Sequence, residues 1–286
     1  MKKINVILSS LTIFGLMTGC GGSSNSGSNT TTSENESATD ETQTVADANV
    51  PAEITMTVTP KGEVQIMLDG SQTATIDWGD GSPVETVTLG STPWHEHHYA
   101  KKTEYTMHIT GENITDLGCP SHIKTLQLNV PTLKELLCVT NELTTLDLSP
   151  TPALKRLNCY NNFLKTLNVS QNSALEELNC YGNKLTALDV SKNPALTSLE
   201  CGSNQLTSLD VSQNSKLSML DCSDNKLSTE ALNALFRTLC TNNNDKSIYI
   251  GSNPGTDACD RTIAEKKGWI VEEYMEGDPP SRDDEF

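Results

Sequence analysis

The middle of the chain repeats one pattern of apolar and polar positions every 21 residues. In each copy a cysteine lies two residues after a leucine, and an asparagine follows that cysteine three residues later. The cysteines are Cys138, Cys159, Cys180, Cys201 and Cys222, and the asparagines are Asn141, Asn162, Asn183, Asn204 and Asn225. Such a fixed period is typical of a solenoid, in which each coil buries its apolar face against the next coil.

The repeat can be written L-x-x-L-x-C-x-x-N-x-L-x-x-L-[DN]-[LV]-S-x-N-x-x. It resembles the leucine-rich-repeat consensus with cysteine at the third apolar position, and its short length is similar to that of the internalin type. The resemblance implies strands on both sides of each coil, with Leu, Leu and Cys inward on the first side and Leu and Val inward on the second. It also implies that each ladder asparagine bonds backbone groups at the turn, within its own coil and in a neighbouring one.

Partial copies of the repeat extend the array at both ends. Ile114–Cys119 matches the first half of a repeat, and Ile248–Ile250 with Asn253 matches another after an insertion. The insertion contains a helical pattern at 229–239, with Ser228 or Thr229 as its N-cap. A second helix at 257–267 and a strand at 269–271 would cover the open end. We therefore predict a solenoid at 113–239, a capping segment at 240–275 and a disordered acidic tail at 276–286.

A smaller folded unit is predicted at residues 51–112. Ile54–Val58 and Val64–Leu68 alternate apolar and polar residues around Pro60-Lys61-Gly62, which predicts a hairpin. Residues 74–78, 84–89 and 105–109 are further short strands in this interpretation. Several short strands with turn signals between them favour a small β-sandwich, so we predict a mainly β chain.

Three motifs of this unit resemble those of one family. They are Ile-Asp-Trp-Gly-Asp-Gly-Ser at 76–82, His-His-Tyr at 97–99 and Glu-Tyr-Thr-Met at 104–107. Together they resemble the PKD family of Ig-like domains, although Ile-Asp-Trp replaces the usual aromatic pair and Thr103 stands where the family has glycine. The resemblance implies a spacer or an accessory binding module.

The first residues have the features of an export signal. Lys2 and Lys3 precede an apolar stretch from Ile4 to Met17 that is too short to span a membrane. Leu16-Met17-Thr18-Gly19-Cys20 resembles the bacterial lipobox, which implies a signal peptide at 1–19 and a palmitate-type lipid anchor on Cys20; ordinary secretion is the alternative. Residues 20–50 are rich in Gly, Ser, Asn and Thr and are predicted to form a disordered tether. Because no acidic residue follows Cys20 directly, we expect an outer-membrane lipoprotein of the cell envelope, on its periplasmic or its surface face.

Charge narrows the range of partners. Of 286 residues, 37 are acidic and 20 are Lys or Arg, which gives a net charge of -17. Nucleic acids and anionic membrane surfaces require a cationic face, so we expect no nucleic-acid partner and contact with a membrane through the lipid anchor only. We also expect a monomer without a cofactor.

The stretch Trp94-His95-Glu96-His97-His98-Tyr99 raises a metal hypothesis, because imidazole and carboxylate groups bind zinc. On a strand, however, His95 and His97 would lie on one face and Glu96 and His98 on the other, too few for a closed site. The chain has no His-Glu-x-x-His motif. We favour a sandwich strand with surface histidines, and we expect Asp80 to bond its own turn instead of calcium.

The column of cysteines allows three interpretations. Neighbouring coils place Cβ atoms about 4.8 Å apart, beyond the usual disulfide geometry. A straight column also does not converge tetrahedrally on a metal. We therefore expect inert core residues at Cys119, Cys138, Cys159, Cys180, Cys201 and Cys222. Cys240 and Cys259 lie outside the column, and whether they form a disulfide stays open.

On the second side, Asp147, Asn168, Asp189 and Asp210 form another column. Like charges this close repel one another, and calcium could relieve the repulsion. We favour solvated side chains that bond neighbouring serine and backbone groups.

Positions three, five and seven of the repeat point away from the core on the first-side sheet. On the early coils these positions bring together Leu137, Val139, Arg156, Asn158, Tyr160, Asn179 and Tyr181. Tyrosine is favoured where a surface must be both apolar and hydrogen-bonding, although it also simply suits a strand face. We take this cluster as the candidate site for a protein partner or for a sugar stacked on the rings.

The favoured function is that of a lipid-anchored, non-catalytic envelope protein that binds a protein or glycan through its solenoid face. The alternative is a metal-assisted hydrolase that uses the His95–His98 cluster. The chain contains no nucleophile elbow, phosphate-binding glycine loop or complete set of metal ligands to support it. A structural subunit of an outer-membrane complex is a third possibility that the residues do not separate from the first.

Overall fold

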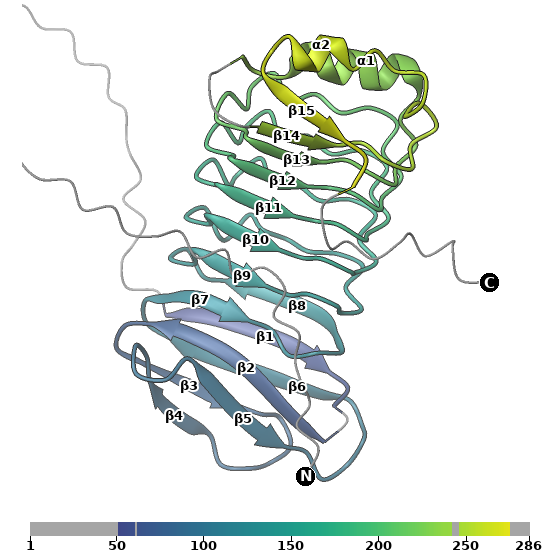
Figure 1. Ribbon diagram of the computed structural model, residues 1–286. Helices are drawn as coiled ribbons and strands as arrows, with labels where there is room; N and C mark the ends of the chain where they lie inside the picture. Colours follow the sequence, from purple (N-terminus) through teal and green to yellow (C-terminus); the bar gives the residue numbers. More distant parts are fainter. Residues whose placement is uncertain (1–50, 61, 242–245, 275–286) are drawn as a thin grey trace, which may run out of the picture. The chain divides into compact units, whose positions relative to one another are not determined.

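The computed structural model describes residues 51–60, 62–241 and 246–274. The predicted signal peptide, Cys20, the tether and the acidic tail at 276–286 lie outside the described residues. The described chain contains fifteen strands and two helices, and the strands form one five-stranded and one ten-stranded sheet (Figure 1). A sandwich, a β-solenoid and a helical C-terminal cap follow one another, which confirms the predicted mainly β fold class.

Eight strands build the sandwich. They are β1 (Ala52–Val58), β2 (Glu63–Gly70), β3 (Thr73–Asp77), β4 (Glu85–Thr88), β5 (Trp94–His98), β6 (Tyr105–Gly111), β7 (Ile114–Gly118) and β8 (Ile123–Asn129). Side chains alternate between the core and the outside, as in β1, where Ile54 and Met56 are fully buried.

The predicted hairpin between β1 and β2 is wrong. β1 pairs with β6 and β8, whereas β2 pairs with β5 and β7, so the two strands lie in different sheets. Both strands bury their apolar faces in one core from opposite layers, and the chain must therefore cross between the sheets. Proline and glycine are local turn signals that fit either path.

The sandwich and the solenoid share a sheet. β7 pairs antiparallel with β2 on one edge and parallel with β9 (Glu135–Leu137) on the other. Leu117 of β7 lies beside Leu68 of β2 and Leu136 of β9, and all three belong to one continuous buried cluster. The boundary predicted between residues 112 and 113 thus falls between strands of a common core.

Each repeat contributes one short parallel strand to the first side of the solenoid. After β9 these strands are β10 (Arg156–Asn158), β11 (Glu177–Asn179), β12 (Ser198–Glu200) and β13 (Met219–Asp221). Neighbouring strands pair in register, so equivalent residues of the repeat lie side by side. The central leucines and the repeat cysteines that follow them are buried.

A buried amide joins each coil to its neighbour. Asn183 Oδ1 accepts a hydrogen bond from Leu164 N at 3.0 Å, and Nδ2 donates to the carbonyl oxygens of Cys159 at 3.0 Å and Cys180 at 3.1 Å. The same set of bonds recurs at Asn162, Asn204, Asn225 and Asn253. Buried backbone groups must find partners, and at this turn the asparagine side chain supplies them. The predicted asparagine ladder is confirmed.

From Leu133 onward the second halves of the described repeats contain no strand, contrary to what the family resemblance implies, whereas the second half of the first partial copy is β8. Backbone bonds between neighbouring second halves are sparse, as at Lys184 N, which donates to Leu164 O at 2.9 Å. Further along, Ser191 N donates to the side chain of Asp189 at 2.9 Å instead of to a neighbouring coil. An isolated backbone bond does not make a strand ladder, so this side is extended chain with buried Leu and Val.

A second ladder of buried asparagines lies at the turn that returns to the first side. Nδ2 of Asn193 donates to the carbonyl oxygens of Val169 at 2.9 Å and Asn172 at 2.8 Å. Asn172 and Asn214 make the equivalent bonds to carbonyl oxygens of the coil before their own. The Ser-x-Asn element of the repeat carries these side chains, and their burial was not predicted.

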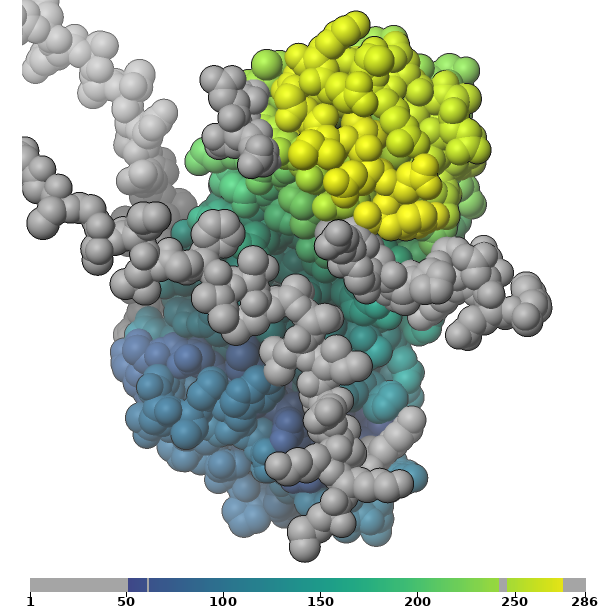
Figure 2. All heavy atoms as spheres, viewed as in Figure 1, coloured from purple at the N-terminus to yellow at the C-terminus, as the bar shows by residue number. Residues whose placement is uncertain are grey.

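The cap consists of α1 (Thr229–Thr238), β14 (Lys246–Tyr249), α2 (Thr262–Glu265) and β15 (Trp269–Glu272). Its atoms, green to yellow in Figure 2, gather at one end of the molecule, where β14 and β15 continue the strand ladder. Ser228 caps α1 as predicted, accepting a hydrogen bond from Ala231 N at 3.3 Å. Neither described helix is long and apolar enough to cross a membrane.

The second helix is shorter than the predicted span of 257–267 and has only four residues. Asp260 N donates to the side chain of Asn233 at 2.7 Å, and Asp260 Oδ1 in turn accepts from Thr262 N at 3.2 Å. The N–H groups of Asp260 and Thr262 thus donate to side chains and not to helix carbonyl groups, and the segment before Thr262 forms turns.

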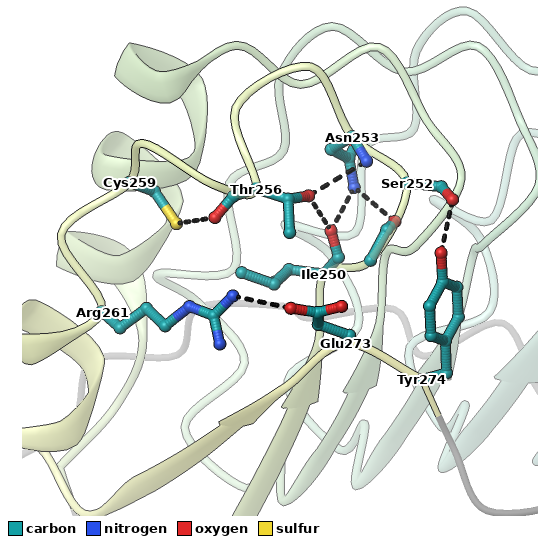
Figure 3. Close-up of polar contacts among 9 residues, drawn as sticks. Ile250, Ser252, Asn253, Thr256, Cys259, Arg261, Glu273 and Tyr274 are labelled. Carbon is teal, nitrogen blue, oxygen red and sulfur yellow. Dashed lines mark hydrogen bonds and ion pairs between the residues drawn. The ribbon is translucent and has the colours of Figure 1, made fainter.

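Polar contacts hold the residues after β15 against the last coil (Figure 3). The hydroxyl groups of Ser252 and Tyr274 share a hydrogen bond of 2.5 Å, and Arg261 Nη2 pairs with Glu273 Oε1 at 3.2 Å. A Cβ atom at Gly251 would lie 2.7 Å from the Tyr274 ring, so glycine is needed where this ring covers the coil.

Asn183→Ala should lower the free energy of unfolding by about 3 kcal/mol, because buried backbone groups would lose their partners. Cys180→Val keeps a buried apolar side chain of similar size and should cost less than about 1.5 kcal/mol. Urea denaturation followed by circular dichroism measures both values. A larger loss for Cys180→Val than for Asn183→Ala would contradict the register of the repeat.

Candidate functional site

The outward side chains of the first-side sheet form the candidate ligand surface. Tyr160 and Tyr181 occupy the same repeat position on neighbouring coils. Their rings are half-buried and stacked, with centroids 5.5 Å apart and planes at 26°. The in-register pairing of β10 and β11 therefore brings the two predicted tyrosines into direct contact.

The Tyr181 ring also packs against the following coil. A Cβ atom at Gly202 would lie 2.7 Å from Asp221 Oδ2 and 2.8 Å from Cδ2 and Cε2 of Tyr181, so a side chain there would force these neighbours to move. Gly202 stands where the two preceding repeats carry tyrosine. The column of tyrosines ends at this coil, and the glycine leaves space that the ring of Tyr181 occupies.

Asn158 and Asn179 position the backbone of the tyrosines. Oδ1 of Asn158 accepts a hydrogen bond from Tyr160 N at 3.2 Å, and Oδ1 of Asn179 accepts one from Tyr181 N at 3.1 Å. Nδ2 of Asn179 donates to Glu200 Oε2 at 2.6 Å. Both asparagines were predicted to contact a ligand, and the structure gives them this local role as well.

Arg156 is held by a carboxylate on the preceding coil. Its Nε donates to Glu135 Oε2 at 3.0 Å, and its Nη2 contacts the same oxygen. The hydrogen bond to Glu135 raises the pKa of Arg156 above its ordinary value. Leu137 is half-buried and Val139 is 38% exposed on the same early coils.

All seven predicted side chains thus belong to the first-side face, and whether they bind a ligand stays a prediction. Sequence reasoning missed Glu135, Glu200 and Gly202, which contact members of the cluster. These residues occupy positions three, five and seven of the repeat. The outward direction of these positions can be read from the 21-residue repeat. Which side chains contact one another across coils depends on their conformations.

The prediction of surface histidines on β5 is wrong for His95 and His97. His95 is 8% exposed, and His97 packs against Trp78 and Tyr99, with ring centroids 4.8 Å and 4.7 Å away. The two histidines share the inward face, as expected from strand geometry, and the sandwich core lies on that face. His98 is exposed on the other face.

Asp80 forms the predicted turn and also pairs with a histidine. Its Oδ1 accepts a hydrogen bond from Ser82 N at 3.0 Å, and its Oδ2 contacts His97 Nε2 at 2.8 Å. Hydrogen bonds from Ser82 and His97 hold the pKa of Asp80 well below its ordinary value. Within the described ranges, no three His, Cys, Asp or Glu side chains gather as a metal ion would require.

The acidic column of the second side faces solvent, as predicted. Asp147, Asn168, Asp189 and Asp210 each accept a hydrogen bond from the N–H of the serine two residues later, at 2.8–3.0 Å. These bonds lower the pKa of Asp147 and Asp189. An open pocket of about 390 Å³ lies between the coils of Asp189 and Asp210 and is lined mainly by small polar side chains.

The cysteines of the described chain are free thiols. The five repeat cysteines are fully buried, and burial raises the pKa of Cys159 to about 12, so these thiols stay protonated and unreactive at neutral pH. Cys119 is only partly buried. The disulfide left open between Cys240 and Cys259 is not formed, and Cys259 Sγ points to Thr256 O at 3.3 Å (Figure 3).

No family model matches the chain, and no curated protein does. Solved structures resemble it, and they are leucine-rich-repeat proteins. The functional domain of InlJ from Listeria monocytogenes, described as including a cysteine ladder, is 29% identical and covers 56% of this chain and 44% of its own, with a TM-score of 0.42. The internalin InlF of the same species is 27% identical and covers 44% of this chain and 36% of its own, with a TM-score of 0.39. A leucine-rich-repeat protein of Leptospira interrogans is 24% identical and covers 43% of this chain and 32% of its own, with a TM-score of 0.36. The match thus spans less than half of each of these proteins.

Proposed function

We propose that this chain is a non-catalytic recognition protein that binds a protein partner through the first side of its solenoid. The stacked pair of Tyr160 and Tyr181 carries the proposal, because it places two large amphipathic rings on a sheet that holds them in fixed positions. We define the tyrosine patch as Leu137, Val139, Arg156, Asn158, Tyr160, Asn179 and Tyr181. Tyrosine and arginine are the residue types enriched where binding energy concentrates.

The geometry of the rings favours a protein over a glycan. Two near-parallel rings whose centroids are 5.5 Å apart face each other, so each covers a face of the other. The Cδ2–Cε2 side of Tyr181 is packed on Gly202 as well. A sugar that stacks on an aromatic ring needs an open face, whereas a protein surface can also contact ring edges and the neighbouring Arg156.

Acidic side chains border the tyrosine patch. Glu135, Glu177 and Glu200 lie on the strands of the same sheet face, and Arg156 pairs with one of them. The whole chain carries a net charge of -17. Complementary charge speeds association and suppresses wrong partners, so we propose a partner whose contact surface is cationic.

We further propose that a lipid on Cys20 anchors the chain to the outer membrane of a bacterial cell envelope. The support is the lipobox-like sequence Leu16–Cys20 and the polar stretch at 21–50 that follows it. A flexible tether of this length has a reach of about 30 Å. The solenoid would then be presented away from the membrane surface.

The histidines of β5 do not form the surface site that the hydrolase alternative requires. His95 is buried, and His97 pairs with Asp80 and stacks on Trp78. A hydrolase that uses this cluster therefore gains no support from the geometry.

The double variant Tyr160→Ala/Tyr181→Ala should weaken binding of the partner at least about 30-fold, the loss that corresponds to one interface hot spot. The partner is first captured with the wild-type chain from envelope and host proteins and identified by mass spectrometry. Its affinity is then measured by calorimetry at low and high salt, and we expect weaker binding at high salt because the contact is electrostatic in part.

Two variants serve as controls for this measurement. Phe163→Ala removes an aromatic ring that is 43% exposed and packs on Lys184, and Asp189→Ala alters the second side. Both should leave the affinity unchanged. If the double variant keeps full affinity for the partner, the site lies elsewhere, and the sandwich becomes the next place to test.

Cys20→Ser should abolish incorporation of labelled palmitate and leave the chain uncleaved or released from the membrane, because the sulfur that carries the diacylglycerol is lost. Metabolic labelling and fractionation of expressing cells give both readouts. Unchanged labelling of the Cys20→Ser chain would refute the anchor but leave the binding proposal intact.

A further inference from the structure

A lysine and a cysteine lie side by side under the cap. Lys246, the first residue of β14, is 1% exposed, and its Nζ lies 3.2 Å from Cys240 Sγ and 3.3 Å from Cys240 O. The ring of Trp269 covers the amine at 5.0 Å from Nζ to its centroid. Nε1 of Trp269 donates to Cys240 O at 2.9 Å, which fixes the segment that carries the thiol.

The surroundings of this amine are unusual for a lysine. Among the described residues no carboxylate pairs with Lys246, and its polar contacts are the carbonyl and thiol groups of Cys240. Burying a charged group without an opposite charge is costly. The contact places a nitrogen nucleophile against a sulfur atom.

We propose that Cys240 and Lys246 form a sulfur–nitrogen cross-link when a peroxide oxidises the thiol. The Cys240 thiolate attacks one peroxide oxygen: an S–O bond forms, the O–O bond breaks, and the second oxygen leaves as water after taking up a proton. Sulfur is thereby oxidised by two electrons to a sulfenic acid, and the peroxide is reduced.

The lysine amine completes the reaction. After losing a proton, Nζ of Lys246 attacks the sulfenic sulfur, so an S–N bond forms, the S–O bond breaks and a second water leaves. One thiol, one amine and one peroxide thus give a sulfenamide and two waters. Sulfenic acids condense in this way with nitrogen or with a second thiol, and thiols reverse the product.

The other thiols of the described chain are placed less well for this chemistry. The repeat cysteines are fully buried, and burial raises the pKa of these thiols. Cys259 directs its Sγ to Thr256 O, and its cationic neighbour Arg261 carries a guanidinium group, which is not a nucleophile (Figure 3). Cys240 is half-buried, and its Sγ lies 3.6 Å from Leu217 O and 3.2 Å from the lysine amine.

The cross-link would join the segment after α1 to the start of β14. The helix that covers the end of the solenoid would then be covalently fastened to the sheet it covers. Oxidising conditions would form the cross-link and stabilise the cap against unfolding, and reduction would break the cross-link.

The test uses the full chain treated with hydrogen peroxide, alkylated and digested with a protease that cleaves before aspartate. Cleavage before Asp245 and Asp257 places Cys240, Lys246 and Cys259 on three separate peptides. We expect the peptides of Cys240 and Lys246 to appear joined, with the mass of the pair lowered by two hydrogens, about 2 Da, and to separate after treatment with dithiothreitol.

Two variants make the result specific. Cys259→Ser should form the same joined peptides, whereas Lys246→Arg, which keeps the positive charge, should form none. If Lys246→Arg fails to fold, the digest of the wild-type chain decides by itself. A sulfinic acid on Cys240 beside an unmodified Lys246, or a Cys240–Cys259 disulfide, would overturn the proposal.

Discussion

Each coil of the solenoid turns sharply after its strand, and the turn leaves backbone groups in the apolar core that the ladder asparagine must satisfy. Asn183 illustrates the arrangement, with one oxygen and one nitrogen that together bond three backbone groups on two coils. Only a side chain with both a donor and an acceptor at the same depth can do this. Every coil must return an asparagine to the same place, and the longer coil between Asn225 and Asn253 does so as well. The constraint also favours a small side chain such as Cys180 beside the amide.

A stack held by bonds between neighbours has two ends that need closing. At one end β7 belongs both to the sandwich and to the strand ladder, and its Leu117 packs in the core of each. At the other end α1, β14 and β15 cover the last coil, with the buried Lys246 and the half-buried Cys240 in contact with Trp269. The sandwich is therefore the N-terminal closure of the solenoid as well as a unit of its own. The tyrosine patch lies on the coils between these two closures.

Features that depend on local pattern could be predicted from the sequence, and features that depend on distant pairing could not. The 21-residue period was enough to place the ladder amides, the buried thiols and the outward face of Tyr160 and Tyr181. The strands that pair with β1 could not be predicted from the local pattern, because Pro60 indicates a turn but does not determine which sheet the next strand joins. Burial of His97 likewise depends on Trp78, which is distant in sequence. The orientation of the tyrosine rings required the contact of Tyr181 with Gly202 on the next coil.

Because the sandwich and the solenoid share one core, we expect them to unfold together. Native-state hydrogen exchange of the full chain, measured by mass spectrometry at increasing denaturant concentration, tests this expectation most directly. If the two parts unfold together, amides of β1 and β2 and amides of β10–β12 will reach the same free energy of opening and exchange in one unfolding event. Exchange of the β10–β12 amides at a clearly lower free energy, with β1 and β2 still protected, would contradict the shared core.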